Sequence, residues 1–464
     1  MDPQIVIKPP LDSLPPEVLG RIFIYFLEHP EKRLGMPNPR ILCSVCLNWR
    51  AVALSTPQLW TRIVVTILSG ISRERAEKKV VGLNTWIGRS GTLPLTLYLG
   101  RGWGWTDDDE DADVPVVLIM EALTRHASRW EAVYFDFMAH LPAVPRRYMI
   151  PFYTNFPFAS WSSLRRISSS NHFAPLQHNK SVPWSQITHF TIEADMSPQV
   201  ALGIFEHCPH LLEVRITLDS TSTQAIPRST SSPIIRHGLR KLDLISCKLE
   251  LLISAITLPS LTDLKLILLP PNSSKANHLI NLMTRSQCKL DKLIFSGVAL
   301  SADDVAKCLE HESCRSLTEL TIEHTLLTHP LPRGFPSITG DILQRLTLHP
   351  SNPTPLCPNL TYLRLHKGEW DTIDTVVNMV SSRLRPDEIP NLKISRMRHL
   401  HVEVLFHHEL EQRLSEVAQR SGLNYSSGGD SAFFTFIASR EAITGNVGPA
   451  YINYHHHPFF FPMQ

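Results

Sequence analysis

Apolar residues at helical spacing fill three short runs between Leu14 and Ile63. The first run follows Pro15, Pro16 and Glu17 and consists of Val18, Leu19, Ile22, Phe23, Phe26 and Leu27. The second run consists of Ile41, Leu42, Val45, Cys46, Trp49, Val52 and Ala53. Steps of three and four residues predict a helix in each case, and the two prolines and the glutamate suit a first helical turn. Thr56 can cap a third short helix that carries Leu59, Trp60 and Ile63.

Three helices this short cannot bury all of their apolar faces against one another. A domain of about 50 residues is only marginally stable by itself, because it removes too little apolar surface from water. We therefore expect the apolar surface that remains on this segment to be a docking site.

A different pattern recurs from about Trp130 onward: the phrase L-x-x-L-x-L, with other apolar residues allowed at the L positions. Clear copies begin at Ile187, Leu211, Leu239, Leu261, Leu290, Leu317, Leu343 and Leu360. We assign a final copy to Met397, and weaker early copies begin at Trp130 and Leu164. Consecutive clear copies start 22 to 29 residues apart, except that Leu360 follows Leu343 by 17. A period of about 20–29 residues is typical of a leucine-rich repeat array.

Each copy predicts a short strand, and the segments between copies predict helices or irregular returns. In L-x-L the two apolar side chains point to one face of a sheet and the middle residue points to the other. Stacked parallel strands would bury the first face and expose the middle residues as one stripe. This stripe consists of Thr191, Arg215, Asp243, Lys265, Ile294, Thr321, Thr347, Arg364 and His401. Because its charge is mixed, the stripe favours a protein ligand over an anionic polymer.

The segment between the two patterns predicts a helix from Ser72 to Arg89, a strand from Leu93 to Leu99 and a helix from Met120 to His126. Acidic residues dominate Asp107 to Asp113, which predicts a solvated loop.

Composition narrows the classes of function. The chain has 464 residues, 43% of them hydrophobic, and a net charge of +2, which gives no electrostatic case for nucleic-acid binding. No apolar run approaches the ~18–20 residues that span a membrane, and the sequence from Met1 to Gln4 does not resemble a secretory signal. The eight cysteines are scattered among apolar residues, as in a reducing compartment. We expect a cytoplasmic or nuclear protein.

The N-terminal segment resembles the F-box, the module that joins a protein to a Skp1-containing ubiquitin ligase. The resemblance rests on Leu14-Pro15-Pro16-Glu17, Val45-Cys46-Leu47-Asn48-Trp49-Arg50 and Pro57-Gln58-Leu59-Trp60. It implies that a Skp1-like adaptor docks on a face formed or supported by Leu14, Pro15, Val18, Leu19, Ile22, Phe23, Val45, Cys46, Trp49, Leu59 and Trp60. One departure is the proline-containing insert from His29 to Arg40, which lengthens the connection between the first two helices.

The repeat region resembles leucine-rich repeats, although the family's Asn or Cys after the strand is matched only by Cys247. The run from Gly91 to Leu97, the helix after Met120 and Trp130 are similar to the large F-box families of mushroom-type fungi. The predicted fold class is α/β. We expect an F-box at 1–66, a linking helix-strand-helix segment with an acidic loop at 67–125, an irregular repeat solenoid of short parallel strands and returning helices at 126–425, and a tail at 426–464.

Candidate chemistry is sparse. Cys43 and Cys46 form a C-x-x-C, which could be a redox pair or half of a zinc site, but no second pair follows at zinc-finger spacing. We interpret them as buried thiols on a helix. His407-His408 and His455-His456-His457 could bind metal, but they lack acidic or cysteine partners nearby, and we favour a tail for the second group. We find none of the common nucleotide-binding, hydrolase or metalloprotease motifs, and we expect no catalysis, cofactor or metal.

The resemblance implies a non-catalytic, substrate-recognition adaptor of a Skp1–cullin–F-box ubiquitin ligase. The repeat surface would hold an unknown protein substrate for the recruited E2, without nucleic acid or membrane. Two alternatives stay open: a scaffold that uses the F-box or the repeats only for binding, and an enzyme built from dispersed residues of the repeats.

Overall fold

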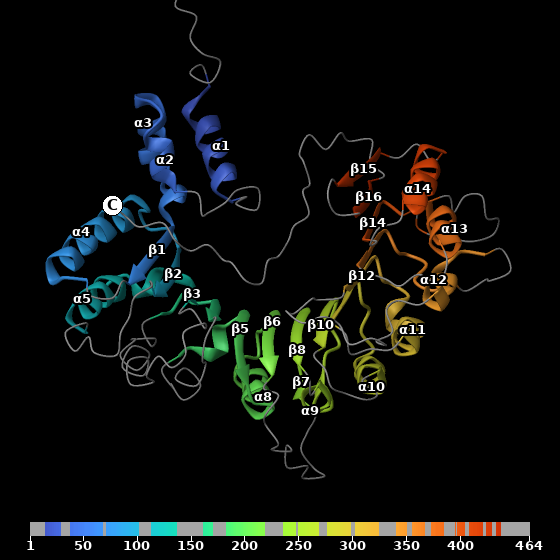
Figure 1. Cartoon of the computed structure of the whole chain (residues 1–464). Helices are drawn as coiled ribbons and strands as arrows, with labels where there is room; N and C mark the ends of the chain where they lie inside the picture. Colours follow the sequence, from blue (N-terminus) through green and yellow to red (C-terminus); the bar gives the residue numbers. More distant parts are fainter. Residues whose placement is uncertain are drawn as a thin grey trace, which may run out of the picture. The chain divides into compact units, whose positions relative to one another are not determined.

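The chain has a mixed α/β architecture with an open, mostly parallel sheet, so the predicted fold class is confirmed at this level (Figure 1). The computed structural model describes residues 14–28, 38–67, 71–101, 113–136, 161–169, 182–218, 235–246, 249–268, 276–297, 302–323, 340–349, 355–366, 373–384, 395, 397–403, 408–420, 424–428 and 433–437. Outside these ranges lie Asp107 to Asp111 of the acidic stretch, Cys247, His407 and the His455–His457 run. Two compact units divide the chain, residues 1–183 with 445–464 and residues 184–444.

The first unit opens with helices α1 (Pro16–Glu28), α2 (Pro39–Cys43) and α3 (Leu47–Ser55) and the 3-10 turn η3 (Pro57–Trp60). The prediction of one continuous helix from Ile41 to Ala53 is wrong. A turn at Ser44 and Val45 ends α2, and the Cys46 thiol then caps α3 by accepting a 3.4 Å hydrogen bond from the Trp49 N–H. The apolar spacing continues through this break, which is why periodicity alone did not reveal it.

These helices share one core. Its buried members are Leu19, Phe23, Leu27, Leu42, Val52, Ala53, Leu59 and Trp60. The Trp60 ring N–H donates a 2.8 Å hydrogen bond to the Ala53 carbonyl, and the Phe23 ring lies 4.8 Å from that of Trp49. Full burial of one such large apolar side chain contributes about 1.5–3 kcal/mol, so these contacts set the order of the helices.

A parallel sheet follows in the same unit. Its strands, in spatial order, are β1 (Arg62–Ile67), β2 (Leu95–Arg101), β3 (Trp130–Asp136) and β4 (Arg166–Ser169). Helix α4 (Arg73–Arg89), capped by Ser72, and helix α5 (Asp113–Thr124) pack together, and the turn η5 (Ala127–Arg129) precedes β3. The predicted helix from 72 to 89 is confirmed. The predicted helix near Met120 is longer than expected because it begins at Asp113. Trp60 joins the N-terminal helices to α4 through a 4.9 Å edge contact with Trp86.

The second unit contains a larger, mostly parallel sheet. Its strands, in spatial order, are β5 (His189–Met196), β6 (Glu213–Leu218), β8 (Lys241–Ser246), β10 (Asp263–Leu268), β11 (Lys292–Gly297), β12 (Glu319–Glu323), β13 (Tyr362–His366), β14 (His399–Glu403), β16 (Phe433–Ile437) and β15 (Asn424–Gly428). Pairing is parallel from β5 to β14, whereas β16 and β15 are antiparallel. Strands β7 (Ile235–Arg236) and β9 (Ile256–Thr257) form a separate pair.

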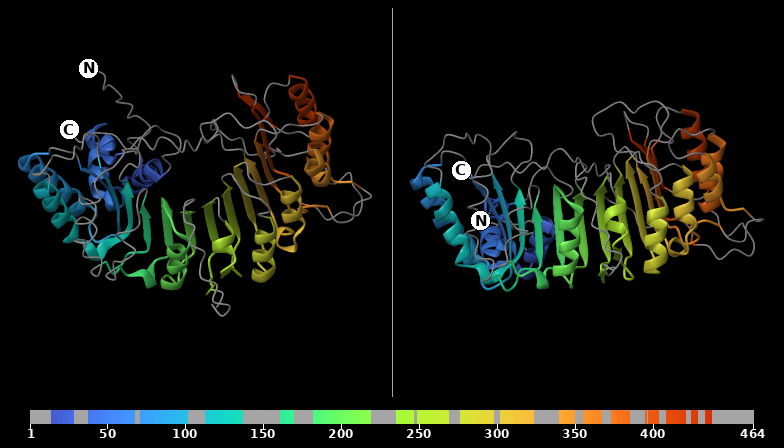
Figure 2. Two further views of the ribbon diagram at one scale, coloured as in Figure 1. Left: turned by 60° about the horizontal axis from the view of Figure 1, so that its bottom comes forward. Right: turned by 90° about the horizontal axis from the view of Figure 1, so that it is seen from below.

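The helices of this unit lie along one face of the sheet (Figure 2). They are α8 (Pro198–His207), α9 (Leu249–Ile253), α10 (Ala276–Ser286), α11 (Ala302–Glu310), α12 (Gly340–Leu346), α13 (Ile373–Leu384) and α14 (His408–Arg420), with the 3-10 turns η7 (Trp184–Gln186) and η8 (Glu312–Cys314). The opposite face of the strands carries no helix among the described elements. We call it the open face.

One hydrogen-bond pattern links successive copies of the repeated phrase. The carbonyl of the second residue in a copy accepts the N–H groups of the second and third residues of the next copy. Arg240, for example, accepts from Thr262 and Asp263 at 2.9 and 3.0 Å, and Thr262 accepts from Asp291 and Lys292 at 2.8 and 3.0 Å. The first residue of each copy is buried, as at Leu211, Leu239, Leu261, Leu290, Leu317 and Leu360. The phrase therefore predicts the strand, which begins two residues after the first residue of each copy. It also predicts the hydrogen-bonded turn that aligns this strand with its neighbour.

The copy at Leu343 does not form the predicted strand. Leu343 and Leu346 lie in helix α12, where both are buried, because a spacing of three residues also suits one face of a helix. The Thr318 carbonyl accepts directly from Thr361 and Tyr362, so β12 pairs with β13 and this copy is passed over. The short spacing of 17 residues before Leu360 was the sequence signal of this irregularity.

Candidate interaction surfaces

Helix α1 separates its apolar residues into two faces. Leu19 and Phe23 are buried in the core, whereas Val18, Ile22 and Tyr25 leave 42%, 44% and 63% of their surface exposed. The exposed residues are three or four positions apart and form one stripe along the helix. This stripe remains accessible to solvent in the described part of the chain.

Helices α2 and α3 and the turn between them add further exposed apolar side chains. Ile41, Val45, Leu47 and Leu54 are 54%, 55%, 79% and 39% exposed. We call Val18, Ile22, Tyr25, Ile41, Val45, Leu47 and Leu54 the N-terminal apolar set. Single exposed apolar residues are ordinary, but several on neighbouring short helices are typical of a protein interface.

The residues that we predicted at the docking face fall into two groups in the structure, one exposed or partly exposed and the other buried. Val18, Ile22, Val45, Pro15 and Cys46 are exposed, and Leu14 and Trp49 are partly exposed. In contrast, four others lie in the interior: Leu19, Phe23, Leu59 and Trp60. These four hold the helices together. Sequence reasoning did not select Tyr25, Ile41, Leu47 and Leu54, although Tyr25 continues the step of three and four residues from Val18 and Ile22.

The exposed charged residues on the described N-terminal helices are mainly basic. Arg21, Arg40 and Arg50 are exposed on the same helices, and Glu17 is an exposed acidic residue beside them. The Arg50 Nε also donates a 2.8 Å hydrogen bond to the Cys43 carbonyl, so it ties α3 back to the end of α2. This bond fixes the turn that displays Val45.

Of the cysteines in this region, Cys46 is exposed and Cys43 is half-buried. The interpretation of both as buried thiols is therefore wrong for Cys46. The helix break explains the difference, because Cys46 precedes α3 and its thiol turns back to cap it. The described cysteines of the second unit are all buried: Cys208, Cys288, Cys308, Cys314 and Cys357.

The open face of the second unit carries the predicted stripe in register, but the prediction that its residues are exposed is wrong: they are half-buried, and Thr321 is buried. Thr191 pairs with Arg215, Arg215 with Asp243, Asp243 with Lys265, and Lys265 with Ile294. The row then continues from Ile294 through Thr321, Arg364 and His401. Thr347 is the exception. It lies at the end of α12 and outside the sheet, so its assignment to the stripe is wrong.

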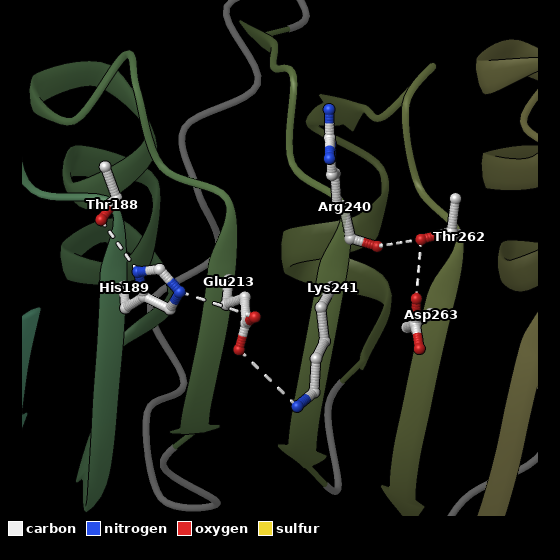
Figure 3. A network of polar contacts seen from close by, with 7 residues as sticks. All are labelled: Thr188, His189, Glu213, Arg240, Lys241, Thr262 and Asp263. Carbon is white, nitrogen blue, oxygen red and sulfur yellow. Dashed lines mark hydrogen bonds and ion pairs between the residues drawn. The ribbon is translucent and has the colours of Figure 1, made fainter. Parts of the chain in front are cut away.

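A second row lies beside the first and alternates in charge. Its members, in register, are His189, Glu213, Lys241, Asp263, Lys292, Glu319, Tyr362 and His399. Glu213 lies 3.5 Å from the His189 ring nitrogen and 3.7 Å from the Lys241 ammonium (Figure 3). Lys292 and Glu319 are 2.6 Å apart. Pairs this exposed contribute about 0–1 kcal/mol each, so they shape the surface more than they stabilise the fold.

Asp243 is the most enclosed carboxylate of these rows. Burial raises its pKa, while the positive charges of Lys241, Lys265 and Arg215 oppose that rise. The carboxylate thus stands among three cations on three adjacent strands. The result is a surface of mixed charge without a large excess of either sign.

The described residues contain no cluster of histidine, cysteine and acidic side chains that could hold a metal ion. Among the helices in the described ranges, none has the length and apolar character needed to cross a membrane. Comparisons with known protein families and with curated proteins return no match to this chain. The functional argument consequently depends on the two surfaces.

Proposed function

We propose that the chain is a substrate-recognition adaptor of a Skp1–cullin–F-box ubiquitin ligase. The N-terminal helices would act as the F-box and dock on a Skp1-like protein, and the repeat region would act as an irregular leucine-rich-repeat solenoid that holds the substrate. The observation that carries this proposal is the division of α1, in which Leu19 and Phe23 fill the core while Val18, Ile22 and Tyr25 stay exposed.

The N-terminal apolar set supports the docking step. Burial of apolar surface contributes roughly 25 cal/mol per Å², and several exposed residues on adjacent helices can supply the centre of an interface. Arg21 and Arg50 at its border favour a partner with acidic residues around an apolar groove.

The open face supports the substrate step. The aligned row from Thr191 to His401 offers charged, hydroxyl and apolar side chains on successive strands, which suits an extended protein surface. The adaptor would act by proximity, since a tethered substrate presents its lysines to the E2 at a raised effective concentration. The thioester chemistry belongs to other subunits.

The docking step is tested by binding of the purified full chain to fungal Skp1. We expect Ile22→Glu combined with Val45→Glu to abolish binding, because two charges would be buried in an apolar interface. Val81→Glu is a matched control, since Val81 is an exposed valine of α4 outside the set. Wild-type chain that fails to bind Skp1, or a double variant that binds normally, would refute the proposal. Leu14→Ala with Trp49→Ala provides a second test on residues that the resemblance selects.

The substrate step is tested by affinity purification under proteasome inhibition. Arg215→Glu with Lys265→Glu reverses the charge beside Asp243 and should remove substrates while Skp1 is retained. Lys307→Glu, on the exposed side of α11, is the control. A non-ligase scaffold is the alternative function. It predicts recovery of Skp1 or other partners without a cullin.

A further inference from the structure

The C-x-x-C of the N-terminal helices is placed at a structural junction. Cys43 is the last residue of α2, Cys46 is the N-cap of α3, and Ser44 and Val45 form the turn between them. The Ser44 N–H bonds back to the Ile41 carbonyl at 3.1 Å and ends α2, so only two turn residues separate Cys43 from Cys46. The turn keeps the two thiols within the same short connection.

Each cysteine also supports the geometry of this turn. The Cys46 thiol accepts the Trp49 N–H, and the Cys43 carbonyl accepts the Arg50 Nε. Three members of the N-terminal apolar set, namely Ile41, Val45 and Leu47, lie within two residues of one of the cysteines. A change at the Cys46 thiol would therefore alter the cap of α3, beside the exposed side chains of the proposed docking surface.

The two thiols differ from the other described cysteines in access. Cys46 is exposed and Cys43 is half-buried, whereas the cysteines of the second unit are enclosed. Burial raises the pKa of Cys208 and of Cys308 to about 12, so these thiols remain protonated and unreactive near neutral pH. Among the described cysteines, thiol chemistry on the folded chain should consequently begin at Cys46.

We propose that Cys43 and Cys46 form a reversible disulfide that switches the N-terminal apolar set out of its binding geometry. The oxidant is a small-molecule disulfide such as oxidised glutathione. The Cys46 thiolate attacks one of its sulfurs and releases one thiol, and Cys43 then displaces the second thiol from the mixed disulfide. The two cysteines lose two protons and two electrons in total, and the oxidant becomes two thiols.

The disulfide would act through the helix cap. A Cys46 sulfur bound to Cys43 is drawn toward α2 and no longer faces the Trp49 N–H, so the first turn of α3 loses its side-chain cap. Val45 and Leu47 move with it. This inference rests on the proposed function, because it names the regulation of that same docking surface.

The first experiment is chemical and needs no partner. The full chain is equilibrated with glutathione buffers of different redox poise, alkylated and digested, and the disulfides are mapped by mass spectrometry. We expect a Cys43–Cys46 disulfide in oxidising buffer that dithiothreitol reverses. Cys247→Ser serves as a background in which the cysteine outside the described residues cannot contribute. Absence of this disulfide under oxidising conditions would overturn the proposal.

The second experiment measures the Kd for fungal Skp1 in oxidised and reduced buffer. We expect the Kd to rise about tenfold on oxidation in the wild type, because the disulfide would remove the side-chain cap of α3 and displace apolar side chains that contact Skp1. The ratio should be near one in Cys46→Ser, which can form neither this disulfide nor the mixed disulfide that precedes it. A wild-type ratio near one despite a mapped disulfide would overturn the switch. Failure to bind Skp1 in either buffer would instead refute the proposed function. In that case the mass-spectrometric mapping would still show whether the Cys43–Cys46 disulfide forms.

Discussion

The guanidinium of Arg383 donates a 2.8 Å hydrogen bond from Nε to the carbonyl oxygen of Leu346. The same side chain, fully buried at 0% exposure, also bonds the carbonyls of Cys357 at 2.8 Å and Leu356 at 2.5 Å. Arg383 of α13 thus ties the end of α12 to the segment that leads into β13. Burial lowers its pKa to about 10, which leaves the group charged at neutral pH.

We expect Arg383→Met to lower the free energy of unfolding by about 3 kcal/mol or more. The substitution removes the Arg383 donors of three carbonyls, of which that of Cys357 keeps the Leu360 N–H, and each buried carbonyl left without a donor costs about 1–3 kcal/mol. Urea unfolding followed by circular dichroism measures the change. Arg413→Met is the control, because Arg413 makes a more exposed pair with Asp374, at 2.6 Å, and should cost under about 1 kcal/mol. Equal costs for the two substitutions would contradict the role of Arg383.

Alkaline pH should destabilise the chain through its buried thiols. Burial raises the pKa of Cys308 from 9.0 to about 12, and that of Cys357 to about 11. Above pH 9 the unfolded chain releases these protons while the folded chain keeps them, so the folded state binds more protons and stability falls as pH rises. The stabilising contribution is complete below pH 9 and is lost as pH rises through the folded pKa.

The measurement is the free energy of unfolding between about pH 8 and about pH 11 under reducing conditions. Removal of one such thiol should make the fall shallower by up to about 1.4 kcal/mol per pH unit. We therefore expect Cys308→Ala to have a lower stability at about pH 8 but a smaller slope than wild type. An unchanged slope would show that Cys308 titrates normally in the folded state.

Substitutions at two neighbouring residues of α1 should have different effects, one on the stability of the chain and the other on Skp1 binding. Phe23→Ala removes a buried ring and should destabilise the chain by about 3–5 kcal/mol. Ile22→Ala removes an exposed side chain and should change stability by less than about 0.5 kcal/mol, yet weaken Skp1 binding. Thermal unfolding and isothermal titration on the same preparations decide this. A folded Ile22→Ala chain with full affinity would remove α1 from the proposed interface.

The stability difference between an Ala and a Thr variant at one surface position shows whether that position lies in a helix or in a strand, and this can be tested for α12. Gln344 is exposed in α12, so Gln344→Ala should be more stable than Gln344→Thr by about 0.5 kcal/mol, following helix propensity. Lys265, within β10, gives the opposite expectation, with Thr more stable than Ala. Unfolding of the four variants in urea measures both differences. Preference for Thr at both positions would restore the strand predicted at Leu343.

The repeat region was predictable because one short phrase fixes several features together. The first residue of the copy at Leu261 fills the interior, Leu264 and Leu266 face the helices, and Lys265 falls into the half-buried row of the open face. Register follows from this alternation, since a slip of one residue would expose every buried position. The row from Thr191 to His401 could thus be written out in advance, apart from Thr347.

Two of the structural predictions made from the sequence were wrong for the same physical reason. The copy at Leu343 and the break at Cys46 both occur where apolar spacing fits two structures equally well. Leu343 and Leu346 satisfy a helix face as well as the phrase, and Val45 and Cys46 continue a helical spacing that the chain does not follow. Packing of α12 against α13 and capping by a thiol decide these cases, and neither is visible in a periodic pattern.

The direct link from the Thr318 carbonyl to Thr361 and Tyr362 has a consequence for how such a chain can change. The pairing of β12 with β13 uses groups of the two strands and of the residues just before them, so the sheet does not fix the length of chain between them. Residues can be inserted or removed between β12 and β13 while the strands keep their pairing. A lineage of such proteins could therefore change the length of this excursion wherever the contacts of α12 and Arg383 are kept, and present new contact surfaces on an unchanged frame.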